Sequence, residues 1–251
     1  MMDFWVAGST NPNATMRLFC LPFAGGNTLT YRAWSQWLPR EVDLCPVRLP
    51  GREGRFKEAC YQDAVPLAQA LASGLSSRLD LPFAFFGHSM GALVAFELAR
   101  VLRRQGGPEP FCLMVSGREA PHLPLSRKAY HDLPDPELID ELRNYGGTPE
   151  IVLQNEEIME IFLPTIRADF AIGETYAYVQ EAPLGCPIRA FGGETDHLVS
   201  KADLDVWRQH TIDSFGLHMF SGGHFYLNGA KMSSLVRMVS GELERLTPVR
   251  K

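Results

Sequence analysis

The sequence predicts a single α/β domain built on a mostly parallel, doubly wound sheet, with a helical insertion near its middle. Three observations lead to this prediction: six short apolar runs bounded by glycine and proline, segments of helical spacing between them, and a lapse of this alternation over residues 118–183. Strands that alternate with helices favour a parallel sheet, because the crossover helices cover its two faces. A chain of 251 residues is long enough to bury one core of its own.

The apolar runs give the expected strands in order. They are RLFCLPF at 17–23, VDLCPVRLP at 42–50, LPFAFFG at 81–87, FCLMVSG at 111–117, PIRAFGG at 187–193 and FGLHMFSGG at 215–223. Helical spacing between and after these runs predicts helices at 31–38, 64–79, 92–104 and 233–246.

The insertion at 118–183 contains no convincing strand. The segment LPDPELIDELRNYG at 133–146 has proline and aspartate at a helix start and glycine near its end, and residues 156–178 follow with a long amphipathic pattern. We expect residues 16–248 to form one domain with this insertion as a helical lid over the sheet's edge. Residues 1–15 read as a polar, flexible leader.

Composition excludes several classes of function. Hydrophobic residues make up 45% and charged residues 21% of the chain, and no apolar run approaches the roughly 20 residues of a membrane span. A net charge of −5 argues against a general nucleic-acid binder. The cysteines are scattered without a CxxC pair, which predicts buried thiols in a reducing cytoplasm and no metal site; they are Cys20, Cys45, Cys60, Cys112 and Cys186.

The stretch FFGHSMGALVAFELA at 85–99 places Ser89 in a G-x-S-x-G turn between an apolar strand and an alanine-rich helix. Small residues two positions before and after the serine allow so sharp a turn, and the helix start directs its amides toward the hydroxyl. This context predicts a nucleophile. The alternative is a packing turn in which the serine only caps the helix.

A serine nucleophile needs a base, and the base needs a carboxylate to orient it. Asp196 follows the strand at 187–193, and His224 lies in a glycine-lined loop after the last strand. We predict His224 as the base and Asp196 as its orienting group, with Glu194 as the alternative carboxylate. His88 is expected on the opposite side of the turn from the reaction.

Two backbone amides must face the oxyanion that forms during acyl transfer. The Met90 N–H at the start of the helix is one. The second is expected from the loop PFAGG at 22–26, where glycines let the backbone fold toward the serine. We favour Ala24 as this donor over Phe23; a glycine-rich turn without a catalytic role is the alternative.

These motifs together resemble the α/β-hydrolase superfamily, and within it the type II thioesterases of polyketide synthases and nonribosomal peptide synthetases. The resemblance is carried by LFCLPFAGGNTLTYRAW, VRLPGREGRF, FFGHSMGALVAFELA, FGGETDHLV and SGGHFYL, in that order, over residues 17–246. It implies hydrolysis of acyl groups from the phosphopantetheine thiol of carrier proteins, with no cofactor. It also implies Ser89, His224 and Asp196 as nucleophile, base and orienter. His197 stands where the family often has proline.

Two further features have competing interpretations. Phe162, Phe170, Tyr176 and Tyr178 in the insertion are candidates for an acyl channel, although packing against the sheet also explains their spacing.

Arg48, Arg52 and Arg55 form a basic cluster suited to a phosphate or to an acidic carrier surface, whereas pairing with Glu53 and Glu58 is the simpler explanation.

Two rival functions share these motifs. A general carboxylesterase or lipase would use the same triad on oxygen esters, and a catalytically silent hydrolase fold would only bind a carrier protein or a small ligand. The favoured prediction is a monomeric cytoplasmic thioesterase whose partners are acyl carrier domains, with neither nucleic acid nor membrane as a partner.

Overall fold

The computed structural model describes residues 4–8, 11–124, 128–229 and 232–247. Its sheet has six strands in the order β2-β1-β3-β4-β5-β6, and every neighbouring pair is parallel. The predicted α/β fold class and all six predicted strands are confirmed. The strands are β1 (Met16–Leu21), β2 (Val42–Pro46), β3 (Phe83–His88), β4 (Cys112–Ser116), β5 (Ile188–Gly193) and β6 (Phe215–Phe220).

The helices follow most of the predicted pattern. They are α1 (Leu29–Arg32), α2 (Ala64–Gly74), α3 (Met90–Arg104), α4 (Asp135–Tyr145), α5 (Glu150–Leu153), α6 (Glu156–Glu174), α7 (Lys201–Asp205) and α8 (Met232–Leu246), with 3-10 turns η1 (Ala33–Gln36), η2 (Glu53–Arg55), η3 (Ser76–Arg78) and η4 (Val206–His210). The helix predicted at 31–38 is instead a single turn, α1, followed by η1. The elements α5, α7 and η4 are too short to give a periodic signal and were not predicted.

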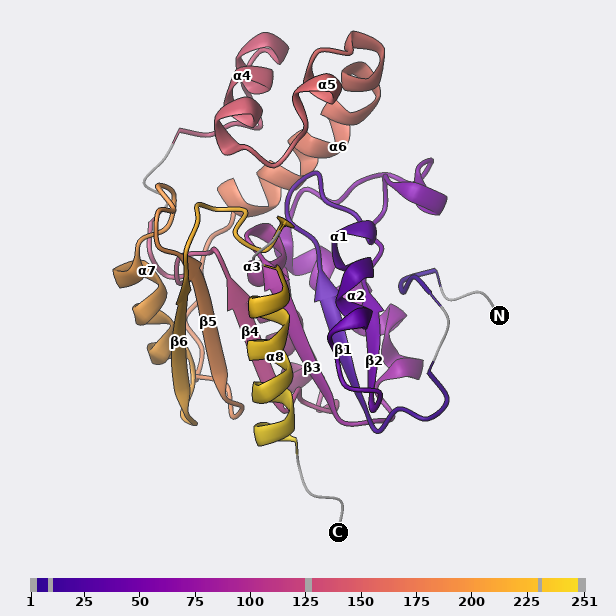
Figure 1. The fold of residues 1–251 in the computed structure, drawn as a ribbon, viewed down its shortest axis with the longest axis vertical. Coiled ribbons are helices and arrows are strands. Elements are labelled where there is room, and N and C mark those ends of the chain that lie inside the picture. The colour runs from indigo at the N-terminus through magenta and orange to yellow at the C-terminus, as the bar shows by residue number, and fades with distance from the viewer. Residues whose placement is uncertain (1–3, 9–10, 125–127, 230–231, 248–251) are drawn as a thin grey trace.

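The sheet separates two apolar layers, because successive side chains of a strand point to opposite faces. In β1, Phe19 and Leu21 join the layer beneath α2 and α3, whereas Leu18 and Cys20 join the layer beneath η1 and α8. Figure 1 shows α8 against one face of the sheet and the other layer behind it. Strands β1, β3, β4 and β5 are buried along their whole length, as expected for a sheet covered on both faces.

The insertion between β4 and β5 folds into α4, α5 and α6, which lie beyond one end of the sheet (Figure 1). Its helices have a separate apolar cluster that includes Leu138, Leu142, Met159 and Leu163. As the sequence predicts, a glycine ends the first of these helices: Gly146 adopts a left-handed φ of 75° at the C-terminus of α4.

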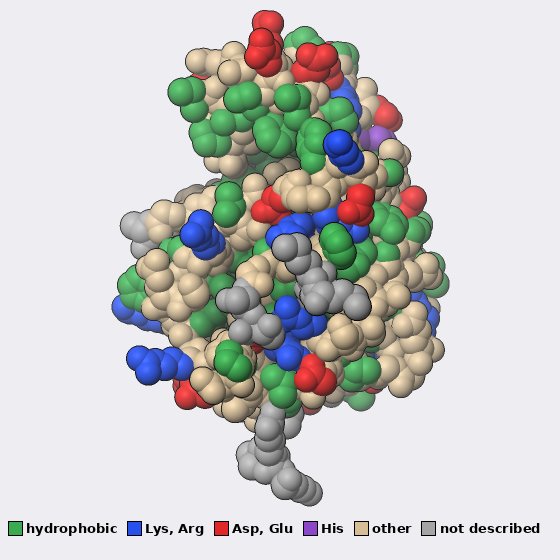
Figure 2. Space-filling model, turned by 90° about the vertical axis from the view of Figure 1, so that its right-hand side faces the viewer, with side chains coloured by type: hydrophobic (Ala, Val, Ile, Leu, Met, Phe, Trp, Pro, Cys, Tyr) green, Lys and Arg blue, Asp and Glu red, His purple; other side chains and the backbone are tan. Residues whose placement is uncertain are grey.

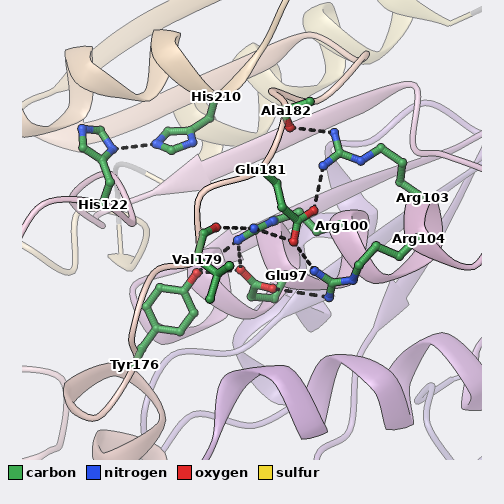
Figure 3. Close-up of polar contacts among 10 residues, drawn as sticks. All are labelled: Glu97, Arg100, Arg103, Arg104, His122, Tyr176, Val179, Glu181, Ala182 and His210. Carbon is green, nitrogen blue, oxygen red and sulfur yellow. Dashed lines mark hydrogen bonds and ion pairs between the residues drawn. The ribbon is translucent and has the colours of Figure 1, made fainter.

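The segment between α6 and β5 runs along α3 and is joined to it by a polar network (Figure 3). Arg100 of α3 pairs with Glu97 and with Glu181, each at 2.6 Å. The Tyr176 hydroxyl donates to the Glu97 carboxylate at 2.6 Å. These contacts attach residues 175–183 to the body of the domain.

Part of the predicted leader is packed against the domain. Val6 is buried, and it forms an antiparallel bridge with Val47 just beyond β2. The ring of Trp5 lies under the Arg55 guanidinium, 3.9 Å from its carbon. Residues 4–8 therefore do not form the flexible leader that the sequence predicts, because Trp5 and Val6 pack against the domain. Residues 1–3 and 9–10 of the predicted leader lie outside the described part of the chain, and so does residue 248 at the end of the predicted domain.

Among the helices of the described segments, none combines the length and the apolar character that crossing a bilayer requires.

Candidate active site

The serine turn has the conformation that its sequence predicts. Ser89 lies between β3 and α3 with φ 53° and ψ −116°, one of two described non-glycine residues with positive φ. A Cβ at Gly87 would lie 2.1 Å from the Gly91 carbonyl oxygen, and a Cβ at Gly91 would lie 2.4 Å from the Leu21 carbonyl oxygen. Both glycines are required sterically, because β1, β3 and α3 meet here with backbone against backbone.

The predicted base and its orienting group lie together. His224 Nδ1 is 2.8 Å from Asp196 Oδ2, and both side chains are almost fully buried. The two loops that carry them touch at their backbones, since a Cβ at Gly193 would lie 2.4 Å from the Gly223 carbonyl oxygen. Of the two candidate carboxylates, Asp196 is the one that is hydrogen-bonded to the imidazole in this structure.

The electrostatics of this pair favour an ionised carboxylate. Burial acts to raise the pKa of Asp196, but the hydrogen bond and charge of His224 and the N–H groups of Leu198 and Val199 hold this pKa below its usual value. The carboxylate therefore stays negative at neutral pH and accepts the hydrogen bond from His224 Nδ1. That is the role of the acid in a Ser-His-Asp triad.

Ser89 and His224 line the same cavity of about 510 Å³. His224 Nε2 is buried and has no hydrogen-bond partner in the described part of the chain. Its hydrogen bond to the Ser89 hydroxyl is therefore not formed in this structure. Such bonds are often long in the absence of substrate. The unpartnered nitrogen is the atom that would take the hydroxyl proton.

The predicted oxyanion donors lie around the same cavity. Residues 23–26 form a turn that is closed by a hydrogen bond of 2.8 Å, which the Gly26 N–H donates to the Phe23 carbonyl. Gly25, within this turn, has φ 74°. Ala24 and Met90 both line the cavity with Ser89. Met90 is the first residue of α3, whose first N–H groups have no partner within the helix. Their part in binding an oxyanion stays a prediction.

His88 lies next to His224, contrary to the prediction that the turn carries it to the other side. Its ring centroid is 4.9 Å from that of His224, and its Nδ1 is 2.9 Å from Ser116 Oγ, which in turn is 2.5 Å from the Tyr226 hydroxyl. Burial, with a contribution from the charge of His224, lowers the pKa of His88 well below its usual value. A neutral imidazole therefore supports the base on one side. The sequence carried no signal for this contact.

The remaining histidines lie outside this group. His197 and His224 line a second, shallow depression, so another imidazole lies near the predicted base. His122 pairs with His210 at 2.7 Å, and His131 with Glu174 at 2.7 Å, both away from the serine. Within the described part of the chain, no three His, Cys, Asp or Glu side chains cluster as metal ligands would.

The cavity is mainly apolar and runs between the strand ends and the insertion. Figure 2 shows hydrophobic side chains gathered on the lobe that the insertion forms, above a hollow between the lobe and the body. Of the four aromatic candidates, Phe162 and Phe170 line the cavity. Tyr176 and Tyr178 do not, because they pack toward Glu97 and His210 on α3 and η4.

The arginine cluster is only partly explained by the nearby glutamates. Arg48 pairs with Glu53 at 3.4 Å and Arg55 with Glu58 at 2.6 Å, as the simpler interpretation expects. Arg52 instead points inward and pairs with Asp169 of α6, 117 positions away in the sequence.

Comparisons with known proteins identify the family of the chain. Residues 16–243 match the family model described as a thioesterase domain. The gramicidin S biosynthesis protein GrsT from Aneurinibacillus migulanus is 43% identical over 228 residues, which cover 91% of this chain and 89% of GrsT.

Two solved structures share the fold over nearly their whole length. RedJ, a thioesterase from the prodiginine biosynthetic pathway in Streptomyces coelicolor, is 39% identical with a TM-score of 0.88, covering 93% of this chain and 92% of RedJ. BorB, the type II thioesterase from the borrelidin biosynthetic cluster, is 37% identical with a TM-score of 0.86, covering 97% and 99%. The chain therefore belongs to the thioesterase family and is a thioester hydrolase with the α/β-hydrolase fold.

Proposed function

We propose that this thioesterase removes acyl groups from the phosphopantetheine thiol of carrier proteins in polyketide or nonribosomal peptide biosynthesis, through a Ser89-His224-Asp196 triad. One observation carries the proposal: a serine on a strained strand-to-helix turn and a buried His–Asp pair border one largely apolar cavity. The names of GrsT, RedJ and BorB, which belong to biosynthetic pathways or clusters, support this class of substrate.

The reaction follows from the positions of the side chains. His224 Nε2 takes the proton of Ser89 as the hydroxyl oxygen attacks the thioester carbonyl. The developing oxyanion lies between the N–H groups of Met90 and Ala24. The tetrahedral intermediate collapses, the carbon–sulfur bond breaks, and the pantetheine thiol leaves with a proton from His224. Water activated by His224 then cleaves the acyl-serine by the same two steps.

The insertion, residues 118–183, serves as a lid that supplies the acyl-binding wall. Leu142, Val152, Met159 and Ile166 from its three helices line the cavity, which suits an aliphatic acyl chain more than a charged one. Movement of this lid admits the pantetheine arm. We further propose that the enzyme acts as a monomer in the cytoplasm.

The decisive experiment compares two kinds of substrate. Hydrolysis is measured on a series of acyl groups loaded on carrier proteins and on the matching p-nitrophenyl esters, with the Ser89→Ala variant as the control. We expect kcat/KM to be higher on the carrier thioesters and to fall to the background in the variant. A preference for the oxygen esters would favour a general esterase. A wild-type protein that leaves both kinds of substrate intact would favour a silent binding protein.

A further inference from the structure

The turn that carries the predicted second oxyanion donor is hydrogen-bonded to a buried ion pair, Arg52 and Asp169, which also lines the cavity. The Gly25 N–H donates to Asp169 Oδ2 at 2.8 Å, and Arg52 Nη1 donates to the Gly26 carbonyl at 2.8 Å. Ala24 therefore precedes two residues whose backbone polar groups are bonded to the pair. The first of them, Gly25, also packs on α6, since a Cβ there would lie 3.2 Å from Ile166.

The two side chains are joined by a double hydrogen bond. Arg52 Nη2 lies 2.6 Å from Asp169 Oδ1, and Nη1 lies 2.9 Å from Oδ2. Their exposed fractions are 6% for Arg52 and 1% for Asp169. Burial acts to lower the pKa of Arg52, but the charge of Asp169 overcomes this effect and raises the pKa. The Arg52 guanidinium is thus charged, and its two hydrogen bonds hold the pair in one geometry.

We propose that Arg52 and Asp169 are positioning residues, which clamp the Phe23–Gly26 turn so that the Ala24 N–H faces the oxyanion formed at Ser89. Since Asp169 belongs to α6 of the insertion, the clamp also completes the oxyanion hole only when α6 is docked on the body. This inference rests on the proposed acyl transfer at Ser89. It gives the insertion a part in catalysis beyond lining the acyl cavity.

The orientation of the Ala24 N–H matters for the reaction rate because the hydrogen bonds of an oxyanion hole are directional. A donor stabilises a transition state only if it points at the place where charge develops, and a displacement of about 1 Å is enough to cost about 100-fold in rate. Without the pair, the Gly25 N–H and the Gly26 carbonyl lose their partners and the turn reorients to bond water. The pair itself needs no contact with the substrate to act in this way.

A double substitution tests the clamp. Arg52→Met/Asp169→Leu replaces the pair with apolar side chains of similar volume, a change that buried ion pairs often tolerate without loss of stability. We expect a fall in kcat of about 10- to 100-fold with KM changed less than about threefold. Asp169→Asn keeps an oxygen for the Gly25 N–H and is expected to lose less activity.

A second buried pair provides the matched control. Arg189 of β5 and Glu242 of α8 lie 2.7 Å apart with exposed side-chain fractions of 2% and 9%, and neither lines the catalytic cavity. The variant Arg189→Met/Glu242→Leu should keep the wild-type kcat. Thermal unfolding of each variant shows that the rates are measured on folded protein, and Asp169→Asn decides the question if the double variant does not fold.

The same variants are tested with a fluorophosphonate probe, whose rate of attachment to Ser89 also depends on the oxyanion hole. A folded Arg52→Met/Asp169→Leu protein with kcat and probe rate within twofold of wild type would overturn the clamp, and so would a rise in KM alone, which indicates a binding role. If the wild type does not hydrolyse carrier thioesters, the proposed substrate is wrong, and the probe rates still decide whether the clamp operates.

Discussion

The two walls of the catalytic cavity are built in different ways. The wall at the strand ends, which carries Ser89, Asp196 and His224, is fixed by backbone packed on backbone at Gly87, Gly91 and Gly193. The opposite wall, from α4 to α6, is held by its own small apolar cluster and exposes Ile151, Ile161 and Phe162 to solvent. We infer that the first wall carries the reacting groups, whereas the second determines which acyl group is accepted and, through Asp169, holds the Phe23–Gly26 turn in place.

The largest expected effect comes from the nucleophile. Ser89→Ala removes the attacking oxygen and should lower kcat by roughly 10⁵-fold, because triad members act as a unit. Fold and cavity should be kept, since the side chain differs by one atom. Steady-state hydrolysis of an acyl-carrier thioester measures the loss, and circular dichroism checks the fold. A variant that retains a tenth of the wild-type rate would place the nucleophile elsewhere.

Asp196→Asn comes next in size. The amide keeps the shape of the carboxylate but cannot stabilise a protonated His224 or hold its tautomer, so kcat should fall by about 10³- to 10⁴-fold. Glu194→Gln is the matched control and should change kcat less than about threefold. The reverse ranking of these two variants would make Glu194 the orienting group.

Stability should be most sensitive at the glycines of the first wall. Gly91→Ala places a Cβ 2.4 Å from the Leu21 carbonyl oxygen, and such overpacking against backbone should cost about 3 kcal/mol of unfolding free energy. Gly241→Ala, in α8 with nothing within 4 Å of the new Cβ, should instead stabilise by about 0.5 to 1 kcal/mol. Denaturant unfolding measures both, and equal effects would contradict the close packing of the turn.

The second wall should tolerate substitution and change specificity instead. Val152→Phe reduces the cavity, so long acyl chains should lose about fourfold in kcat/KM for each methylene that is displaced, while short chains keep their rate. Ile151→Phe is the control, because this neighbouring side chain is 79% exposed and lies outside the cavity lining. Loss of activity on every chain length would show that Val152 does more than line the acyl cavity.

The last prediction concerns the contact between His122 of the insertion and His210 of η4, both drawn in Figure 3. Burial lowers the pKa of His210 to about 4, so between pH 6.5 and 4 the unfolded chain binds a proton that the folded chain does not. Stability is therefore complete above about pH 6.5 and falls toward pH 4, by at most about 1.4 kcal/mol per pH unit. His210→Asn should flatten this dependence in denaturant unfolding, and an unchanged slope would contradict the assignment.

The sequence predicts the residues of the first wall better than those of the second. Ser89, Asp196 and His224 each follow a strand in a glycine-marked turn, and parallel strands bring their ends to one edge, so local patterns were sufficient to predict that the three lie at the same edge of the sheet. Asp169 and His88 carry no such signal. Asp169 sits in an ordinary helical pattern, and its partner Arg52 lies 117 residues earlier. Only the packing of α6 on the body brings the two together.

In the proposed reaction, Ser89 carries the acyl group between the attack on the thioester and the hydrolysis of the acyl-serine. The most direct measurement is a rapid acid quench of the enzyme with an acyl-carrier thioester, followed by mass spectrometry of its peptides. We expect an acyl adduct on Ser89 that forms with the first turnover, decays by hydrolysis, and is absent from Ser89→Ala. An adduct on another residue during full turnover would contradict it.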